Sequence, residues 1–334
     1  MKIAVIGAGA IGALVAGYLK SKNKNVFLVG HKEAVEAIRN KGLKICGVRG
    51  EFDLKIDTDT RLNFCPDIAI FATKTQDLSC AIKENLEFIA NSVIVITQNG
   101  VQAEDIAARI LSGEKIISSI VMFGSTNLEA GTVVHNFEGS WIIGSAFIKN
   151  SELVSKVKVL LGDIFPVVAT DDIKAMKYLK IFVNANNCIP GILGLSMQEC
   201  FASPEISSIS IGIWKEGHKI VSGSRINLAS LPDFPLERLT KLISLPTTEA
   251  AKIFSGIMAN LSKEPLYGSI LQSIKRGKLS EVDYINGEFV ALAKTNSLRA
   301  PLNSKLVEMV HQVEKTKRFF TKEELINNTK GLFS

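Results

Sequence analysis

The 334-residue sequence has no long apolar run, because no stretch approaches the length of about 18 apolar residues that a membrane-spanning helix needs. Its first residues lead from a short apolar stretch into glycines, unlike the long apolar segment of a secretory leader. Low-complexity tracts are also missing, while 46% of the residues are hydrophobic. These features predict an ordered cytoplasmic protein that is long enough for two domains.

Cysteine is scarce and irregularly spaced. The cysteines are odd in number and lack CxxC spacing, which indicates reduced thiols and no disulfide framework or metal site: Cys46, Cys65, Cys80, Cys188 and Cys200. Basic runs with interleaved aromatic residues are missing too, so the net charge of +6 does not indicate a nucleic-acid groove. That charge suits an anionic ligand, and a phosphorylated cofactor fits this description.

A glycine motif follows the first apolar stretch. Residues 2–6 predict a buried parallel strand, 13–20 a helix and 25–30 a second strand. The GxGxxG motif stands between the first strand and the helix, and its members are Gly7, Ala8, Gly9, Ala10, Ile11 and Gly12. In this context the motif predicts a dinucleotide site: the glycines permit a tight turn, close approach to pyrophosphate and close helix packing.

The end of the second predicted strand bears on the choice between NADPH and NADH. An NAD site usually has a carboxylate there for the adenosine ribose, whereas this chain has His31 and Lys32. Cationic Lys32, helped by His31, suits the 2′-phosphate of NADPH. The alternative is that Lys32 begins a solvated helix and Glu33 reaches the ribose.

Strand and helix patterns then alternate. Residues 67–73, 93–97 and 115–121 predict strands, and 77–90 and 103–111 predict helices, an order typical of a doubly wound sheet. Lys74 and Asn99 follow two of these strands, at the sheet edge where ligands of such folds bind. A turn at Asn99-Gly100 explains that asparagine almost as well.

The domain boundary is expected near residue 170. Residues 132–135 and 141–144 predict a hairpin, followed by a helix at 151–163 and a strand at 167–170. Strand patterns nearly vanish from Ile173 onward. We therefore predict an α/β Rossmann-type dinucleotide-binding domain at 1–170 and an all-α substrate domain at 171–334.

A polar stripe interrupts an apolar helical stretch at the start of the second domain. At about 100° per residue, Asn184 and Asn187 lie within about 40° of Lys180 on a continuous helix, while Asn186 points elsewhere. Asparagine is a poor helix former, so the cluster costs stability. A solvent-facing stripe on a surface helix is the plain interpretation, and a functional stripe is the alternative.

Two further motifs decide between these interpretations: residues 268–274, GSILQSI, and residues 280–287, SEVDYING. Together with Lys180 and Asn184, they make the chain similar to the ketopantoate reductase family (2-dehydropantoate 2-reductases) over essentially its whole length. The resemblance implies NADPH-dependent reduction of a branched 2-oxo acid to a 2-hydroxy acid in pantothenate and coenzyme A biosynthesis.

The resemblance also implies site residues. Lys180 resembles the proton donor to the carbonyl oxygen, and Asn184 and Ser269 resemble substrate-binding residues. Glu281 resembles the glutamate beside the cofactor and the catalytic lysine. Lys74 and Asn99 match the strand-end lysine and asparagine of the family, which meet cofactor or substrate.

One position departs from the family pattern. The family usually has a second substrate asparagine eight residues after the lysine, where this chain has Cys188. Asn187 is adjacent and on the Lys180 face of a continuous helix, so a small adjustment of the helix would let it substitute, and the sequence leaves open whether it does. Near Gln198, where the family often has another substrate asparagine, the match is loose as well.

Three functions therefore stay open. The leading one is reduction of ketopantoate, the second is reduction of a different 2-oxo acid, and the third is a non-catalytic NADP(H)-binding sensor. Retention of Lys180, Ser269 and Glu281 argues against the sensor, because binding NADPH alone needs few of them. The expected partner is a small 2-oxo acid, with no nucleic acid and no membrane. A homodimer is compatible with the sequence, which does not fix the oligomeric state.

Overall fold

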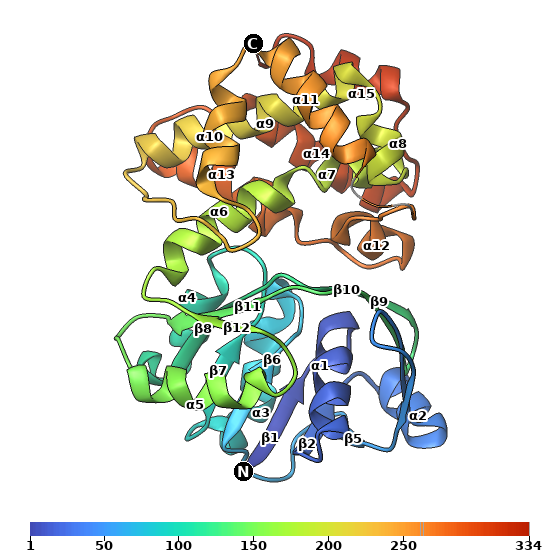
Figure 1. Ribbon diagram of the computed structural model, residues 1–334, viewed down its shortest axis with the longest axis vertical. Coiled ribbons are helices and arrows are strands. Elements are labelled where there is room, and N and C mark those ends of the chain that lie inside the picture. Colours follow the sequence, from blue (N-terminus) through green and yellow to red (C-terminus); the bar gives the residue numbers. More distant parts are fainter. Residues whose placement is uncertain (261, 263, 334) are drawn as a thin grey trace. The chain divides into compact units, whose positions relative to one another are not determined.

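The computed structural model describes residues 1–260, 262 and 264–333. The chain divides into two compact units, Met1–Lys174 and Ala175–Ser334, and both are drawn in Figure 1. Among the described residues, no helix is both long enough and apolar enough to span a membrane.

The first unit is built on an eight-stranded sheet with the order β12-β11-β8-β7-β6-β1-β2-β5. Neighbouring strands are parallel except β11 and β8, which are antiparallel. The strands are β1 (Lys2–Ile6), β2 (Asn25–Val29), β5 (Asp57–Asp59), β6 (Ile68–Phe71), β7 (Val93–Ile96), β8 (Ile116–Val121), β11 (Trp141–Ser145) and β12 (Val167–Ala169). Every residue of β6 and β7 is buried, as expected of central parallel strands covered on both faces.

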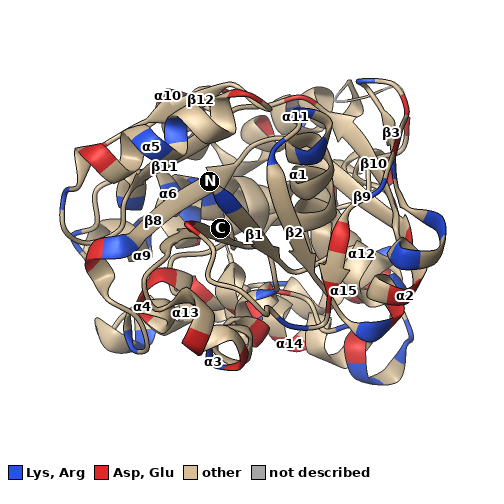
Figure 2. Ribbon diagram, turned by 90° about the horizontal axis from the view of Figure 1, so that it is seen from below, with Lys and Arg blue, Asp and Glu red and all other residues tan. Residues whose placement is uncertain are grey.

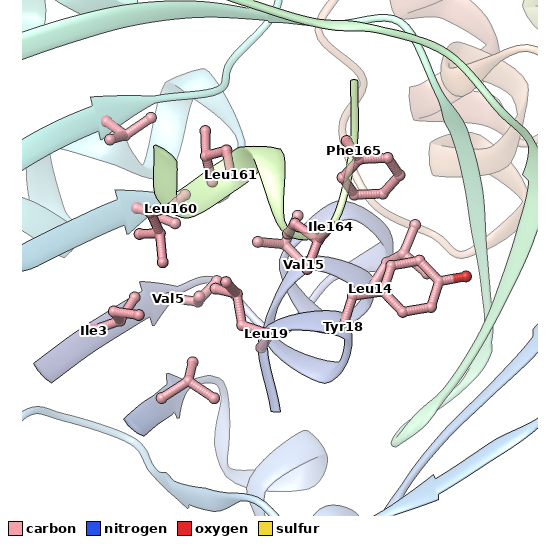
Figure 3. Packing of buried hydrophobic residues seen from close by; sticks show 14 of the residues in the cluster. Ile3, Val5, Leu14, Val15, Tyr18, Leu19, Leu160, Leu161, Ile164 and Phe165 are labelled. Atoms are coloured by element: carbon pink, nitrogen blue, oxygen red, sulfur yellow. The ribbon is translucent and has the colours of Figure 1, made fainter. Parts of the chain in front are cut away.

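Helices cover both faces of this sheet. Helix α1 (Ala10–Ser21) and helix α5 (Ser151–Gly162) pack against one face, where side chains of β1, α1 and the end of α5 interdigitate (Figure 3). The second apolar core lies on the other face, under α3 (Leu78–Ile89) and α4 (Ala103–Ala108). Helix α2 (Lys32–Lys41) follows β2, and two short 3₁₀ helices complete the unit: η1 (Thr75–Asp77) and η2 (Gly113–Lys115). The predicted doubly wound fold is confirmed.

A second sheet of the same unit corrects the predicted hairpin. Its four strands have the order β4-β3-β10-β9, with bounds β3 (Leu43–Gly47), β4 (Phe52–Leu54), β9 (Gly124–Glu129) and β10 (Thr132–Phe137). The two segments expected to pair with each other, β10 and β11, lie in different sheets. Strand β10 pairs with β9 and β3, whereas β11 forms five register pairs with β8. The sequence Gly-Ser-Thr-Asn-Leu-Glu of β9 lacks a clear strand pattern, so the true partner of β10 was missed.

The second unit is helical in its described residues, as predicted. Its helices are α6 (Ile173–Ala185), which begins two residues before the unit boundary, α7 (Cys188–Leu193), α8 (Met197–Phe201), α9 (Pro204–Gly223), α10 (Leu236–Ser244), α11 (Thr247–Ala259), α12 (Ser269–Lys275), η3 (Val282–Tyr284), α13 (Asn286–Thr295), α14 (Pro301–Thr316) and α15 (Lys322–Thr329). Figure 1 shows that they pack on one another without a sheet.

A partly buried network of hydrogen bonds joins three of these helices. The carboxylate of Glu216 on α9 accepts hydrogen bonds from the backbone amides of Leu302 (3.0 Å) and Asn303 (2.8 Å) in the first turn of α14. It also accepts one from the Asn303 side chain at 2.9 Å, and that side chain accepts one from Asn286 on α13 at 3.0 Å. A carboxylate at a helix N-terminus satisfies unpaired amides and matches the helix dipole. Through Asn286, these hydrogen bonds hold the C-terminal end of the segment 280–287 in place.

Replacing Glu216 with alanine is expected to lower the free energy of unfolding by about 2 to 4 kcal/mol, because three donors lose their acceptor. Chemical denaturation followed by circular dichroism measures this change. Glu308→Ala is the matched control, since Glu308 pairs with Lys305 at the surface of α14, and it should change the value by less than about 1 kcal/mol. Equal effects of the two variants would contradict the assigned role of Glu216.

Candidate active site

The glycine loop lies at the carboxyl end of β1, where the chain turns into α1. Gly7 has a φ of +116°, and a Cβ there would lie 2.7 Å from the backbone of Ala72. A Cβ on Gly12 would lie 1.8 Å from the carbonyl oxygen of Gly7. Both positions therefore require glycine, the first for its backbone conformation and the second for close packing of α1.

Gly9 differs from these two glycines, because a Cβ there would meet no protein atom within 4 Å. Gly9 is the N-cap of α1, has no side chain to satisfy the first-turn amides, and is followed by a first turn without acidic residues. An uncapped helix N-terminus beside open space matches the geometry that binds phosphate groups in dinucleotide folds. The loop therefore fits a pyrophosphate.

The loops after β6 and β7 lie side by side at the same edge of the sheet. Phe71 and Ile96 are paired in register at the ends of these strands, and Lys74 and Asn99 each follow three residues later. The side chain of Gln98 donates to the backbone carbonyl of Thr73 at 3.1 Å and so ties the loops together. Both Lys74 and Asn99 are half-buried. The structure thus brings these two predicted residues together.

His31 and Lys32 lie at the end of β2, on the exposed surface of the first unit. Lys32 is 84% exposed in its side chain and its ammonium lies 3.8 Å from the carboxylate of Glu36, one turn along α2. Helix α2 carries both signs of charge (Figure 2). Such an exposed cation is available to a phosphate, although the protein does not hold it in one place.

In the second unit, Lys180 and Asn184 lie one turn apart on α6 and are both half-buried. Loss of hydration lowers the pKa of the Lys180 ammonium to about 8, although attraction to the carboxylate of Asp233 acts in the opposite direction. A lysine with this pKa releases its proton near neutral pH far more readily than an exposed one. It therefore suits general acid chemistry.

Helix α6 ends at Ala185, which corrects the continuous polar stripe expected from the sequence. The indole of Trp214 donates to the carbonyl of Phe182 at 2.8 Å, and the amide of Asn187 turns back to the carbonyl of Asn184 at 2.9 Å. Pro190 has no amide proton for the carbonyl of Asn186, so the helix cannot continue through this segment. Asn187 consequently lies in a tight turn before α7.

The turn places Asn187 beside Gly268, the residue that precedes the predicted site residue Ser269. Its side chain packs against Gly268, with its amide oxygen 3.0 Å from where a Cβ of that glycine would lie. Ser269 follows as the first residue of α12. Cys188, in contrast, is fully buried, and burial raises the pKa of its thiol to about 12. It is a neutral packing residue, so Asn187 and Ser269 are the polar groups that this corner offers.

Gln198 has a role that sequence reasoning missed. Its side-chain amide donates to the backbone carbonyl of Glu264 at 2.9 Å and accepts from the amide of Leu266 at 3.0 Å. These bonds hold the segment that leads into Gly268 and Ser269. A glutamine 66 residues before its partner carries no local signal, because the contact exists only in the folded chain.

Glu281 is buried at the start of η3, which packs on α13 and α14. The flanking residues are fixed, since the amide of Ser280 donates to the carboxylate of Glu314 at 2.7 Å. The SEVDYING run thus holds a carboxylate inside the helical unit at a defined place. The glycine loop and the doubly wound sheet of the first unit are typical of dinucleotide-binding folds, and here a helical unit follows them.

Comparison with known proteins identifies the family. Residues 3–146 match the family model described as ketopantoate reductase PanE/ApbA, and residues 172–314 match the model of its C-terminal part. The 2-dehydropantoate 2-reductase of Pyrococcus horikoshii is 30% identical over 94% of this chain and 98% of its own length, and that of Archaeoglobus fulgidus is 26% identical over the same shares. The chain belongs to the ketopantoate reductase family, as the sequence resemblance predicted.

Solved structures share the fold. A D-mandelate dehydrogenase with NADH and anilino(oxo)acetate superposes with a TM-score of 0.81 at 23% identity, covering 95% of this chain and 99% of that one. A PanE/ApbA family ketopantoate reductase from Ralstonia eutropha gives 0.79 at 20% identity, covering 95% and 99%. At these identities the likeness shows the fold alone.

Proposed function

We propose that this protein reduces 2-dehydropantoate (ketopantoate) to pantoate with NADPH. Family membership and the relatives named 2-dehydropantoate 2-reductase support the reaction. The observation that carries the proposal is Lys180, a half-buried lysine whose pKa is lowered to about 8 and which lies one helical turn from Asn184.

In this reaction, different residues protonate the substrate and orient it. NADPH supplies the hydride when it is bound. Lys180 protonates the oxygen of the 2-oxo group and stabilises the negative charge that develops there. Asn184, Asn187 and Ser269 orient the substrate without acting as rival acids, because their side chains are neutral.

The cofactor is assigned to the first unit. The amides of the loop from Gly7 to Gly12 hold the pyrophosphate, supported by the open space at Gly9. Lys74 and Asn99 contribute at the adjoining strand ends, and His31 and Lys32 attract the 2′-phosphate. The buried carboxylate of Glu281 is assigned to orienting the catalytic groups of the second unit.

A substrate panel tests the proposal. Oxidation of NADPH is measured with ketopantoate, 2-oxoisovalerate, pyruvate and an aromatic 2-oxo acid, and kcat/KM is expected to be highest for ketopantoate. A higher value for another 2-oxo acid would contradict the substrate assignment. Absence of turnover with every compound, despite NADPH binding, would favour the sensor instead.

Variants of Asn187 and Cys188 test whether Asn187 takes the place of the asparagine that the family has at the position of Cys188. Asn187→Ala should raise KM for ketopantoate about tenfold, because a neutral amide that positions the substrate is lost. Cys188→Ala is the matched control and should leave KM near the wild-type value, since the thiol is fully buried. An unchanged KM in Asn187→Ala would show that this side chain does not replace the usual asparagine.

A further inference from the structure

Strand β5 brings a carboxylate to the end of β2. Val29, the last residue of β2, is in register with Asp59, the last residue of β5, and the amide of Gly30 donates to the carbonyl of Asp59 at 3.1 Å. Adjacent strands lie about 5 Å apart. Asp59 therefore stands beside the strand end where dinucleotide folds meet the adenosine ribose.

Arg39 neutralises this carboxylate. From α2 it donates to the backbone carbonyl of Thr58 through Nε at 3.2 Å and Nη2 at 2.9 Å, and its Nη2 lies 2.7 Å from Oδ2 of Asp59. The other oxygen, Oδ1, accepts from the amide of Thr60 at 2.7 Å. The two side chains are about half exposed, at 52% and 45%, so both can meet a ligand at this corner.

The charge of this pair bears directly on the 2′ position of the cofactor. A bare carboxylate beside the ribose accepts hydrogen bonds from the two hydroxyls of NADH and repels the 2′-phosphate of NADPH. When a guanidinium holds the carboxylate, the repulsion is cancelled and one carboxylate oxygen is occupied. The pair thus permits a phosphate next to Lys32.

We infer that the Arg39–Asp59 pair is a determinant of cofactor choice, in which Arg39 acts as a positioning residue that prevents Asp59 from serving as a ribose ligand of the NADH type. The inference rests on the proposed function only in requiring a nicotinamide dinucleotide at this edge of the sheet. It concerns the ratio of the two affinities and not the wild-type preference itself.

The test measures dissociation constants of NADPH and NADH by quenching of protein fluorescence in the wild type and three variants. Arg39→Gln should weaken NADPH at least tenfold while NADH binds as before or more tightly, because Asp59 is released. Asp59→Asn should shift the affinity ratio further toward NADPH, because Arg39 keeps its positive charge while the negative charge beside it is removed. In Arg39→Gln/Asp59→Asn the ratio should return to within threefold of the wild type.

Lys149→Gln is the matched control. It removes the same charge from an exposed pair with Asp171, in the segment after β11, and β11 and β5 lie toward opposite ends of the large sheet. This variant should leave the ratio unchanged.

Equal weakening of both cofactors in Arg39→Gln would overturn the inference, because it indicates a structural role only. An affinity ratio in the double variant that stays more than threefold from the wild-type value would overturn it as well. So would a shift of the ratio toward NADH in Asp59→Asn. If Arg39→Gln does not fold, Asp59→Asn alone decides the matter, and an unchanged ratio in that variant would then overturn the inference. A wild type that prefers NADH, yet shifts further toward NADH in Arg39→Gln, contradicts only the NADPH assignment. Failure of the wild-type protein to bind either cofactor would refute both this inference and the proposed function.

Discussion

Replacing Lys180 with alanine is expected to lower kcat by about a hundredfold to ten-thousandfold, the range that general acid catalysis contributes. NADPH binding should persist, because the loop that holds pyrophosphate lies in the first unit and is not changed. Steady-state rates and a direct cofactor titration measure these two quantities. Lys174→Ala, at an exposed lysine of the same helix, is the control and should keep wild-type turnover.

The activity is expected to fall at alkaline pH, where Lys180 loses its proton. The acid must be protonated to act, and burial lowers the pKa of Lys180 to about 8. Hence kcat/KM should be constant below this value and fall about tenfold per pH unit above it. Lys180→Arg keeps the positive charge but cannot give up a proton in this range, so it should remain slow and lose the alkaline limb. An alkaline limb that persists in either variant would assign the acid to another group.

Gly9→Val is expected to weaken NADPH binding at least about a hundredfold, equivalent to about 2.7 kcal/mol, while the protein stays folded. The Cβ would meet no protein atom within 4 Å, so we expect no steric clash with the folded protein. The added methyl groups would instead fill the space that the pyrophosphate needs. Calorimetric titration and thermal unfolding measure the two effects.

Gly162→Val serves as the matched control for this substitution. It introduces the same side chain in the first unit at a glycine that also has open space, at the end of α5 and not at the glycine loop. Binding should remain as in the wild type. Unchanged NADPH affinity in folded Gly9→Val would remove the glycine loop from the cofactor site.

The parts of the fold that could be predicted are those in which local sequence and tertiary packing favour the same structure. Residues 3–6 are apolar, lie inside the sheet and precede glycines that only a tight turn explains, so β1, the loop and α1 were recognisable. The polar ends of β6 and β7 were recognisable for the same reason, since buried strands have sharp ends.

Strand β5 could not be predicted. Its sequence Asp-Thr-Asp is poor in strand formers, and its strand conformation comes from pairing with the backbone of β2, a contact that exists only in the folded chain. A carboxylate that lies on the strand next to the end of β2 was therefore missed from the sequence.

The candidate site of the second unit was predictable in its residues but not in its geometry. The spacing of Lys180 and Asn184 placed them on one helical face, as α6 does. Besides the local effect of Pro190, the carbonyl of Phe182 near the end of that helix is bonded by Trp214, 32 residues away, and the contact of Asn187 with Gly268 crosses a still longer interval. No helical periodicity contains this information. The roles of these residues stay predictions.

Transfer of a labelled hydride tests the central claim most directly. The protein is incubated with ketopantoate and NADPH that carries deuterium at the transferable position of the nicotinamide, and the product is analysed by mass spectrometry and proton NMR. We expect pantoate with one deuterium, located at C2, in a one-to-one ratio to the NADP⁺ formed. Oxidation of the cofactor without labelled pantoate, or no oxidation while other 2-oxo acids are reduced, would contradict it.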